Sequence, residues 1–173
     1  MKIAIISSAE KTIPMSLLGT LDIIITFFII NNITIVTGGC DGILGYLVKN
    51  TKNKINTICF SPDIDQNNHQ KRQDNLSLEY FSEIKYVEGF TARSLEMIKN
   101  TDAVLALNGR IGTLSEITIA LEEGKRVGII TETGGICDHM EFILDVAHKE
   151  FPNQIFFSPN TQEVLNWLIK KHY

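Results

Sequence analysis

Short apolar runs alternate with longer segments of helical period along the whole chain. The runs have the length and β-branched content of buried strands, and each is followed by a turn and then a segment with helical spacing of apolar residues. This alternation predicts an α/β fold, a Rossmann-like doubly wound parallel sheet with helices on both faces in a single domain. The predicted strands are residues 3–6, 33–37, 55–60, 84–87, 103–107, 126–131 and 154–158, and the main predicted helices are residues 14–30, 91–99, 139–149 and 161–171.

Two predicted strands end in glycine-rich turns that lead directly into a helix. Residues 33–37 are followed by Gly-Gly-Cys-Asp-Gly, and residues 103–107 by Asn-Gly-Arg-Ile-Gly. A helix start presents unpaired N–H groups and the positive end of the helix dipole, which suits a phosphate. Ligands of such sheets bind beyond the carboxyl ends of the strands, so both turns are predicted to form one phosphate or ribose site. The candidate binding residues are Gly38, Gly39, Gly42, Gly109, Arg110, Gly112 and Thr113.

Four further residues near strand ends and helix starts are candidates, each with a structural alternative. Ser7 and Ser8 follow the first strand and can donate to a nucleotide, but such residues are equally common in plain turns and helix caps. Arg93 lies in a first helical turn, where the dipole disfavours a cation, so it either faces an anion or pairs with a nearby glutamate, Glu88 or Glu96. Glu116 is favourable near a helix start through the dipole alone.

The charge and the cysteine content of the chain limit the classes of partner and the cellular compartment that we expect. A net charge of -4 and the lack of a long Lys/Arg block predict no nucleic-acid partner. Three widely spaced cysteines indicate neither a disulfide framework nor a zinc site, so we expect no metal and a cytoplasmic protein. The chain begins with a strand rather than a signal peptide, and the apolar residues 23–30 are too few to span a membrane, so they predict a buried helix.

The polar stretch at residues 63–75 allows two interpretations. It is predicted to be a solvated surface loop, or a flap over the site. In the second case His69, Lys71 and Arg72 would face the ligand.

These motifs resemble the LOG (lonely guy) superfamily, which includes the group often labelled lysine decarboxylase-like and the molybdenum-cofactor carrier proteins. The resemblance spans about residues 2–148. The first glycine loop of the family is matched by residues 38–39 and 42–45. The catalytic arginine of the family lies nine residues before an aspartate, as Arg93 does before Asp102. The second family signature, P-G-G-x-G-T-x-x-E, is matched by Gly109, Gly112, Thr113 and Glu116.

The chain departs from the family pattern at three positions. Asn108 replaces the signature proline, Arg110 its second glycine, and Ile6 the glycine that usually precedes the two serines. Arg110 either fills and closes the phosphate pocket or adds a cation that grips a more anionic ligand.

The resemblance implies hydrolysis of the N-glycosidic bond of a nucleoside 5′-monophosphate, without a metal or redox cofactor. Glu116 would stabilise the oxocarbenium-like ribose or position water, and Arg93 would orient the phosphate or leaving group. It equally implies an alternative, a non-catalytic carrier of a nucleotide or phosphorylated pterin. In either case the partner is a small phosphorylated ligand, and the family implies a homodimer. Lysine decarboxylation has no support, because no motif places a lysine for a Schiff base.

Overall fold

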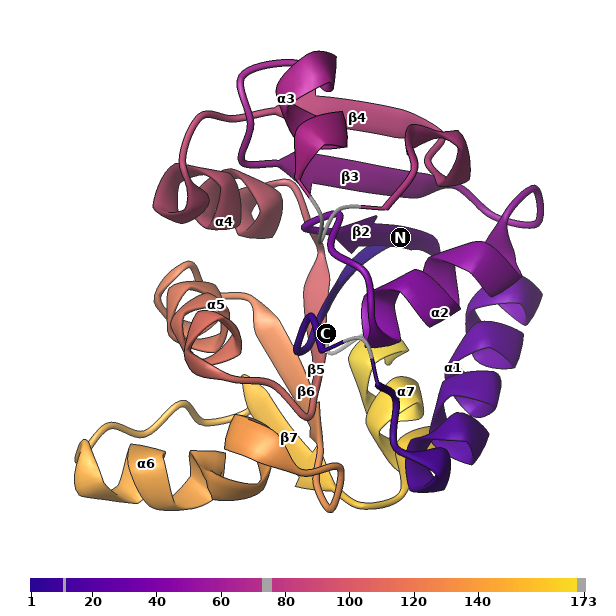
Figure 1. Cartoon of the computed structure of the whole chain (residues 1–173). Helices are drawn as coiled ribbons and strands as arrows, with labels where there is room; N and C mark the ends of the chain where they lie inside the picture. The colour runs from indigo at the N-terminus through magenta and orange to yellow at the C-terminus, as the bar shows by residue number, and fades with distance from the viewer. Residues whose placement is uncertain (11, 73–75, 171–173) are drawn as a thin grey trace.

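Seven parallel strands form one sheet in the computed structural model, which describes residues 1–10, 12–72 and 76–170. Their order across the sheet is β4-β3-β2-β1-β5-β6-β7 (Figure 1). This confirms the predicted single α/β domain with a Rossmann-like sheet. The strands are β1 (Lys2–Ile6), β2 (Thr34–Thr37), β3 (Thr57–Ser61), β4 (Glu83–Tyr86), β5 (Ala103–Leu107), β6 (Arg126–Ile130) and β7 (Ile155–Ser158).

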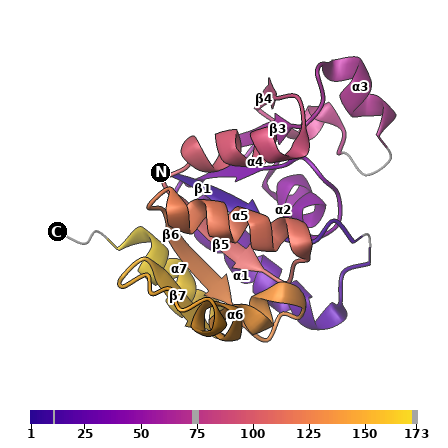
Figure 2. The same ribbon diagram turned by 90° about the vertical axis from the view of Figure 1, so that its left-hand side faces the viewer.

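Helices cover both faces of the sheet, as the sequence pattern predicts. One face carries α1, α2 and α7, and the other carries α4, α5 and α6 (Figures 1 and 2). Side chains of β1 alternate between these layers: Ile3 and Ile5 belong to the core under the first set, and Ala4 and Ile6 to the core under the second. The helices are α1 (Leu18–Ile30), α2 (Ile43–Thr51), α3 (Gln66–Lys71), α4 (Phe90–Lys99), α5 (Ile111–Glu122), α6 (Met140–Val146) and α7 (Thr161–Ile169).

The winding direction of the chain reverses at the middle of the sheet. From β1 the chain moves outward through β2 and β3 to β4, then returns to β5 on the other side of β1 and moves outward again. The register pairs Ile3 of β1 with both Ile35 of β2 and Ala103 of β5. The loops after β1 and β5 therefore leave in different directions, which opens a crevice at the carboxyl ends of these strands.

Several element boundaries differ from the sequence-based expectations. The polar stretch is not all loop, because Asp65 caps α3 by accepting a hydrogen bond from the backbone N–H of Asn68 at 2.8 Å; residues 73–75 lie outside the described part. The predicted helix 139–149 corresponds to α6, which begins one residue later, ends at Val146 rather than 149, and is preceded by a 3-10 helix (Gly135–His139). Helix α7 ends at Ile169, and Lys171 lies outside the described residues.

The apolar segment that resembled a membrane span is a helix of the protein core. Helix α1 has 13 residues, preceded by a 3-10 turn (Met15–Leu17), and buries Leu21, Ile24 and Phe28 against the sheet. No helix among the described residues combines the length and apolar character needed to cross a membrane.

Candidate functional site

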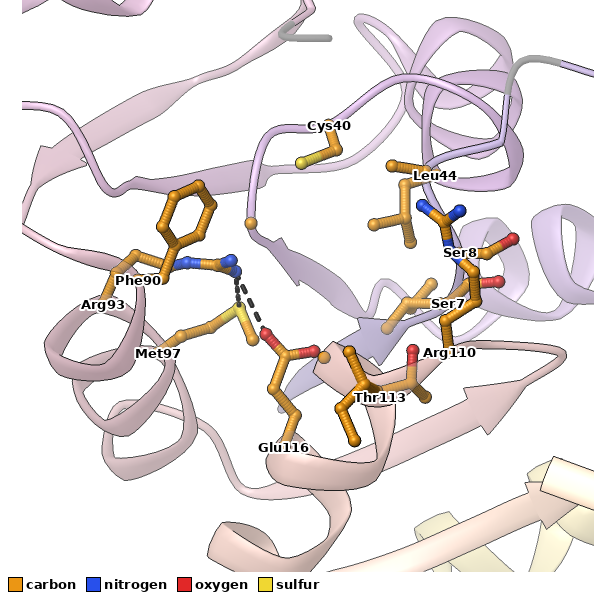
Figure 3. A pocket seen from close by; sticks show the side chains of 15 residues that line it. Ser7, Ser8, Cys40, Leu44, Phe90, Arg93, Met97, Arg110, Thr113 and Glu116 are labelled. Carbon is orange, nitrogen blue, oxygen red and sulfur yellow. Dashed lines mark hydrogen bonds and ion pairs between the residues drawn. The ribbon is translucent and has the colours of Figure 1, made fainter. Parts of the chain in front are cut away.

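A pocket of about 450 Å³ opens at the crevice between the loops after β1 and β5. Four segments form its walls: the end of β1 with the residues after it, the loop into α2 with the start of that helix, and the first two turns of α4 and of α5 (Figure 3). It brings together eight of the predicted site residues: Ser7, Ser8, Gly38, Arg93, Arg110, Gly112, Thr113 and Glu116. The other three, Gly39, Gly42 and Gly109, do not line it, but have positive φ values of 79°, 80° and 96° and shape the two turns.

The centre of the site is an ion pair between Arg93 of α4 and Glu116 of α5. Nη1 of Arg93 donates to Oε1 of Glu116 at 3.1 Å, and the Ser94 hydroxyl donates to the same oxygen at 2.9 Å. Each member of the pair is only 8% exposed. Arg93 therefore pairs with neither of the local candidates, Glu88 and Glu96, but with a carboxylate 23 residues further along the chain.

Burial and the neighbouring charge shift the pKa of Glu116 in opposite directions. Loss of hydration raises the pKa of its carboxyl group above the usual value, while the Arg93 charge and the Ser94 hydrogen bond pull the pKa back down. Because a lone carboxylate at this depth would be costly, the guanidinium and the hydroxyl are what keep the ionised form accessible.

Two buried polar atoms beside the pocket have no partner within the described structure. These are Nε of Arg93 and the hydroxyl of Ser7. Native structures rarely leave buried polar atoms unpaired, so these two donors next to the cavity mark it as a candidate polar site. Ser8, which also lines the pocket, is 4% exposed.

The glycines in the pocket wall serve different purposes. A β-carbon at Gly38 would overlap Nη1 of Arg93 and lie 2.8 Å from its Cζ, so glycine here lets the guanidinium pass against the backbone. A β-carbon at Gly112 would meet nothing within 4 Å. Gly112 lies in the first turn of α5, where packing within the fold does not require glycine, and its small size leaves room in the pocket.

Asn108 builds the turn where the LOG signature has proline. Its φ is 55°, a left-handed value that the proline ring forbids. The backbone N–H of Asn108 donates to Oγ1 of Thr133 at 2.7 Å, and its side-chain amide donates to the Thr133 carbonyl at 2.8 Å. The glycine turn after β6 thus supports the turn after β5. A β-carbon on Gly135 would lie 2.9 Å from the Asn108 carbonyl carbon.

Arg110 lies at the rim of the pocket and leaves the cavity open. Nη1 of Arg110 is 3.6 Å from Oε1 of Glu10, and both side chains are more than half exposed. In Figure 3 its guanidinium extends beside Ser8, away from Arg93. Arg110 therefore does not fill the pocket, and its contribution of a cation to an anionic ligand stays a prediction.

The polar stretch contributes to the site differently from what was expected. His69 does not face the pocket: it is fully buried, with Nδ1 2.9 Å from the Ser61 hydroxyl and Nε2 3.1 Å from the Leu76 carbonyl oxygen. Lys71 does not line the pocket either. Arg72 approaches it indirectly, because its guanidinium lies over the ring of Phe90, which does line the pocket.

Sequence reasoning missed several pocket residues. Phe90 and Met97 flank Arg93 on α4, and Cys40 and Leu44 line the opposite wall. A positional signal existed for Phe90, an aromatic residue one helical turn before the predicted catalytic arginine. Among the described residues no group of three or more His, Cys, Asp or Glu side chains is placed to hold a metal ion.

Comparisons with known proteins place this architecture among related folds. The SLOG cluster4 family model matches residues 1–164. A segment of 36 residues is 50% identical to part of an uncharacterized protein from Archaeoglobus fulgidus. The matched segment is 21% of this chain and 24% of that protein. The molybdenum cofactor binding protein from the phototrophic bacterium Rippkaea orientalis is similar in structure, with a TM-score of 0.73, 20% identity, and coverage of 98% of this chain and 97% of that one. The molybdenum cofactor carrier protein from Chlamydomonas reinhardtii is also similar in structure, with a TM-score of 0.72, 16% identity, and coverage of 98% of this chain and 99% of that one.

One structural neighbour corrects the expectation about nucleic acid. DNA processing protein A from Helicobacter pylori, whose structure concerns single-stranded DNA binding, has a TM-score of 0.60 and 21% identity, covering 98% of this chain and 80% of that one. The prediction of no nucleic-acid partner, drawn from net charge, was therefore wrong. Net charge is a poor criterion because single strands are also bound through local grooves and stacking on aromatic side chains. At these identities the likeness to all three structures shows the fold alone.

Proposed function

The chain belongs to the SLOG cluster4 family, and we propose that its pocket hydrolyses the N-glycosidic bond of a nucleoside 5′-monophosphate, releasing the base and ribose 5-phosphate. The observation that carries this proposal is the buried ion pair of Arg93 and Glu116, which faces the pocket at the switch point of the sheet. A structural ion pair has no need of an adjoining cavity or of an unpaired Nε on its arginine.

The first turn of α5 is suited to the 5′-phosphate. Its N–H groups at Gly112 and Thr113 are not used by the preceding helical turn, and the helix dipole favours an anion there. The Ser7 hydroxyl is an available donor, and Arg110 at the rim adds positive charge. The backbone of Gly39 was also a predicted donor, but this residue lies outside the pocket lining, so we assign it to the shape of the turn.

Glu116 and Arg93 then lie where the sugar carbon C1′ would be held. As the glycosidic bond breaks, its electron pair leaves with the base nitrogen and the ribose gains positive charge, which a fixed carboxylate stabilises. Water adds its oxygen to C1′ and loses one proton, and the departing base takes up one proton. In this scheme Glu116 acts ionised and Arg93 orients the carboxylate and the leaving group.

A non-catalytic carrier of a nucleotide or a phosphorylated pterin is the second candidate. The specific observation in its favour is that Glu116 accepts hydrogen bonds from two protein donors, Arg93 and Ser94. The changes at Asn108 and Arg110 fall in the signature turn, and structural neighbours include molybdenum cofactor binding proteins. In a carrier the same pocket would bind without turnover.

The test is to incubate the purified protein with AMP and with N6-substituted adenosine monophosphates and to measure free base by chromatography. Hydrolysis predicts base release that is lost in Glu116→Gln and in Arg93→Ala. A matched control is Glu141→Gln, which changes an exposed glutamate in the first turn of α6 and should leave the rate unchanged. Binding of AMP or a pterin phosphate without base release in the unmodified protein would establish the carrier instead.

The resemblance also supports a homodimer in the cytoplasm, which we include in the proposal. Light scattering on the purified protein would report the mass in solution. Twice the mass of the chain is the expected result, and a monomer would refute this part alone.

A further inference from the structure

Phe90 is a large apolar side chain on the pocket wall that the protein core does not use. It is 57% exposed, although it is the first residue of α4 and lines the pocket. It lies one helical turn before Arg93, so both side chains project from the same face of α4. Figure 3 shows the ring and the Arg93 guanidinium on one side of the pocket, with Ser7, Ser8 and Arg110 on the other.

The ring is supported from the direction of α3. The Arg72 guanidinium carbon is 4.6 Å from the centroid of the Phe90 ring, a cation–π contact. Arg72 is itself held by Asp63, with Nη1 3.5 Å from Oδ1. This contact covers one face of the ring and restrains its orientation, while the exposed part of the ring remains available in the pocket.

The positions of these groups follow the order of groups in a nucleotide. The α5 helix start offers an anion site, Glu116 follows in the second turn of the same helix, and Phe90 lies beyond Arg93 on the facing helix. A phosphate at the helix start and a sugar at Glu116 leave the next group of the ligand, the base, on the side of Phe90.

We propose that Phe90 is the stacking platform for the planar ring of the ligand, and that Arg72 positions it. This inference rests on the nucleotide site proposed above and specifies which wall receives the base. Every base has a π-face, so stacking supplies affinity for a planar ring without choosing among bases.

Two ligands separate stacking from phosphate binding. AMP carries a base, whereas ribose 5-phosphate has the same sugar and phosphate without one. Calorimetric Kd values for both should be measured with the unmodified protein and with Phe90→Ala, Phe90→Trp and Arg72→Gln. Phe142→Ala is the matched control, because Phe142 is also exposed (69%) but lies on α6 outside the pocket lining.

The expected result is selective. Phe90→Ala should weaken the affinity for AMP about 10-fold or more and leave the affinity for ribose 5-phosphate unchanged. Phe90→Trp should keep the AMP affinity of the unmodified protein. Arg72→Gln should lower the affinity for AMP by a smaller factor and leave that for ribose 5-phosphate unchanged. The inference would be overturned if Phe90→Ala lowered the affinity for both ligands equally or left the AMP affinity unchanged. Failure of the unmodified protein to bind AMP would also overturn it. A change of oligomeric mass in Phe90→Ala without selective loss of AMP would assign the ring to a protein contact instead. Selective loss in a protein that releases no base would leave the platform intact and refute only the hydrolysis.

Discussion

Gly38→Ala tests directly whether the Arg93–Glu116 pair is the centre of the site. A β-carbon at residue 38 would overlap Nη1 of Arg93 and lie 2.8 Å from its Cζ. The φ of Gly38 lies outside the left-handed region, so alanine can adopt the backbone conformation without strain. The clash therefore falls on the far end of the Arg93 side chain, which has to move.

Moving Arg93 breaks its 3.1 Å hydrogen bond to Glu116. Hydrogen bonds to charged groups contribute about 1.5–3 kcal/mol. If the same free energy is missing from the transition state, kcat/KM for base release falls roughly 10- to 150-fold. The displaced charges are no longer paired, and breaking a buried ion pair costs about 3–5 kcal/mol of unfolding free energy. Tm should therefore fall by roughly 6–20 °C.

A double-mutant cycle with Arg93→Ala identifies the cause of that loss. The three atoms nearest to the new β-carbon all belong to Arg93, so removing this side chain removes the clash. Because base release is already lost in Arg93→Ala, the cycle is measured on unfolding free energy, and Gly38→Ala should cost little further unfolding free energy in the Arg93→Ala background. Gly19→Ala, whose β-carbon would meet nothing within 4 Å, is the control. Full activity in Gly38→Ala, or equal losses of unfolding free energy in both backgrounds, would refute the reasoning.

Three other substitutions probe the surroundings of the pair. Ser94→Ala removes a donor that favours the ionised carboxylate, so the pKa of Glu116 should rise further. If activity needs ionised Glu116, the acid limb of the kcat–pH profile should then move to higher pH. An unmoved acid limb would argue against a role for ionised Glu116. Asn108→Pro should lower the unfolding free energy in urea by about 3 kcal/mol or more, because φ is 55° and the N–H is bonded; unchanged stability would disprove this turn geometry. Gly112→Ala should stabilise the helix by about 0.5–1 kcal/mol while weakening AMP binding in calorimetry; unchanged affinity would show that the ligand leaves this space empty.

The fold was predictable because its information is local. Strands buried on both faces read as continuous apolar runs, and amphipathic helices between them require parallel crossovers. Even α1, almost wholly apolar, was assigned correctly to the core, since Asp22 and the Asn31–Asn32 pair limit its apolar run. The end of α6 was less predictable, because the helix stops at Val146 and His148 takes a left-handed φ of 51° inside the predicted range.

Contacts between distant segments were beyond the reach of local patterns. Glu88 and Glu96 were the sequence-local partners for Arg93, yet the packing of α4 against α5 brings Glu116 to it instead. His69 stands in a polar run, but tertiary contacts with Ser61 and Leu76 bury it. Only the resemblance to a known family linked Arg93 with Glu116 in advance.

The two departures inside the signature turn have different physical consequences. Asn108 preserves the architecture: its left-handed backbone and bonds to Thr133 hold the turn that delivers Gly112 to the pocket. Arg110 lies at the rim instead, where its exposed guanidinium pairs with Glu10 and the cavity of about 450 Å³ stays open. An open cavity beside a hydrogen-bonded turn is what the proposed ligand-binding pocket requires.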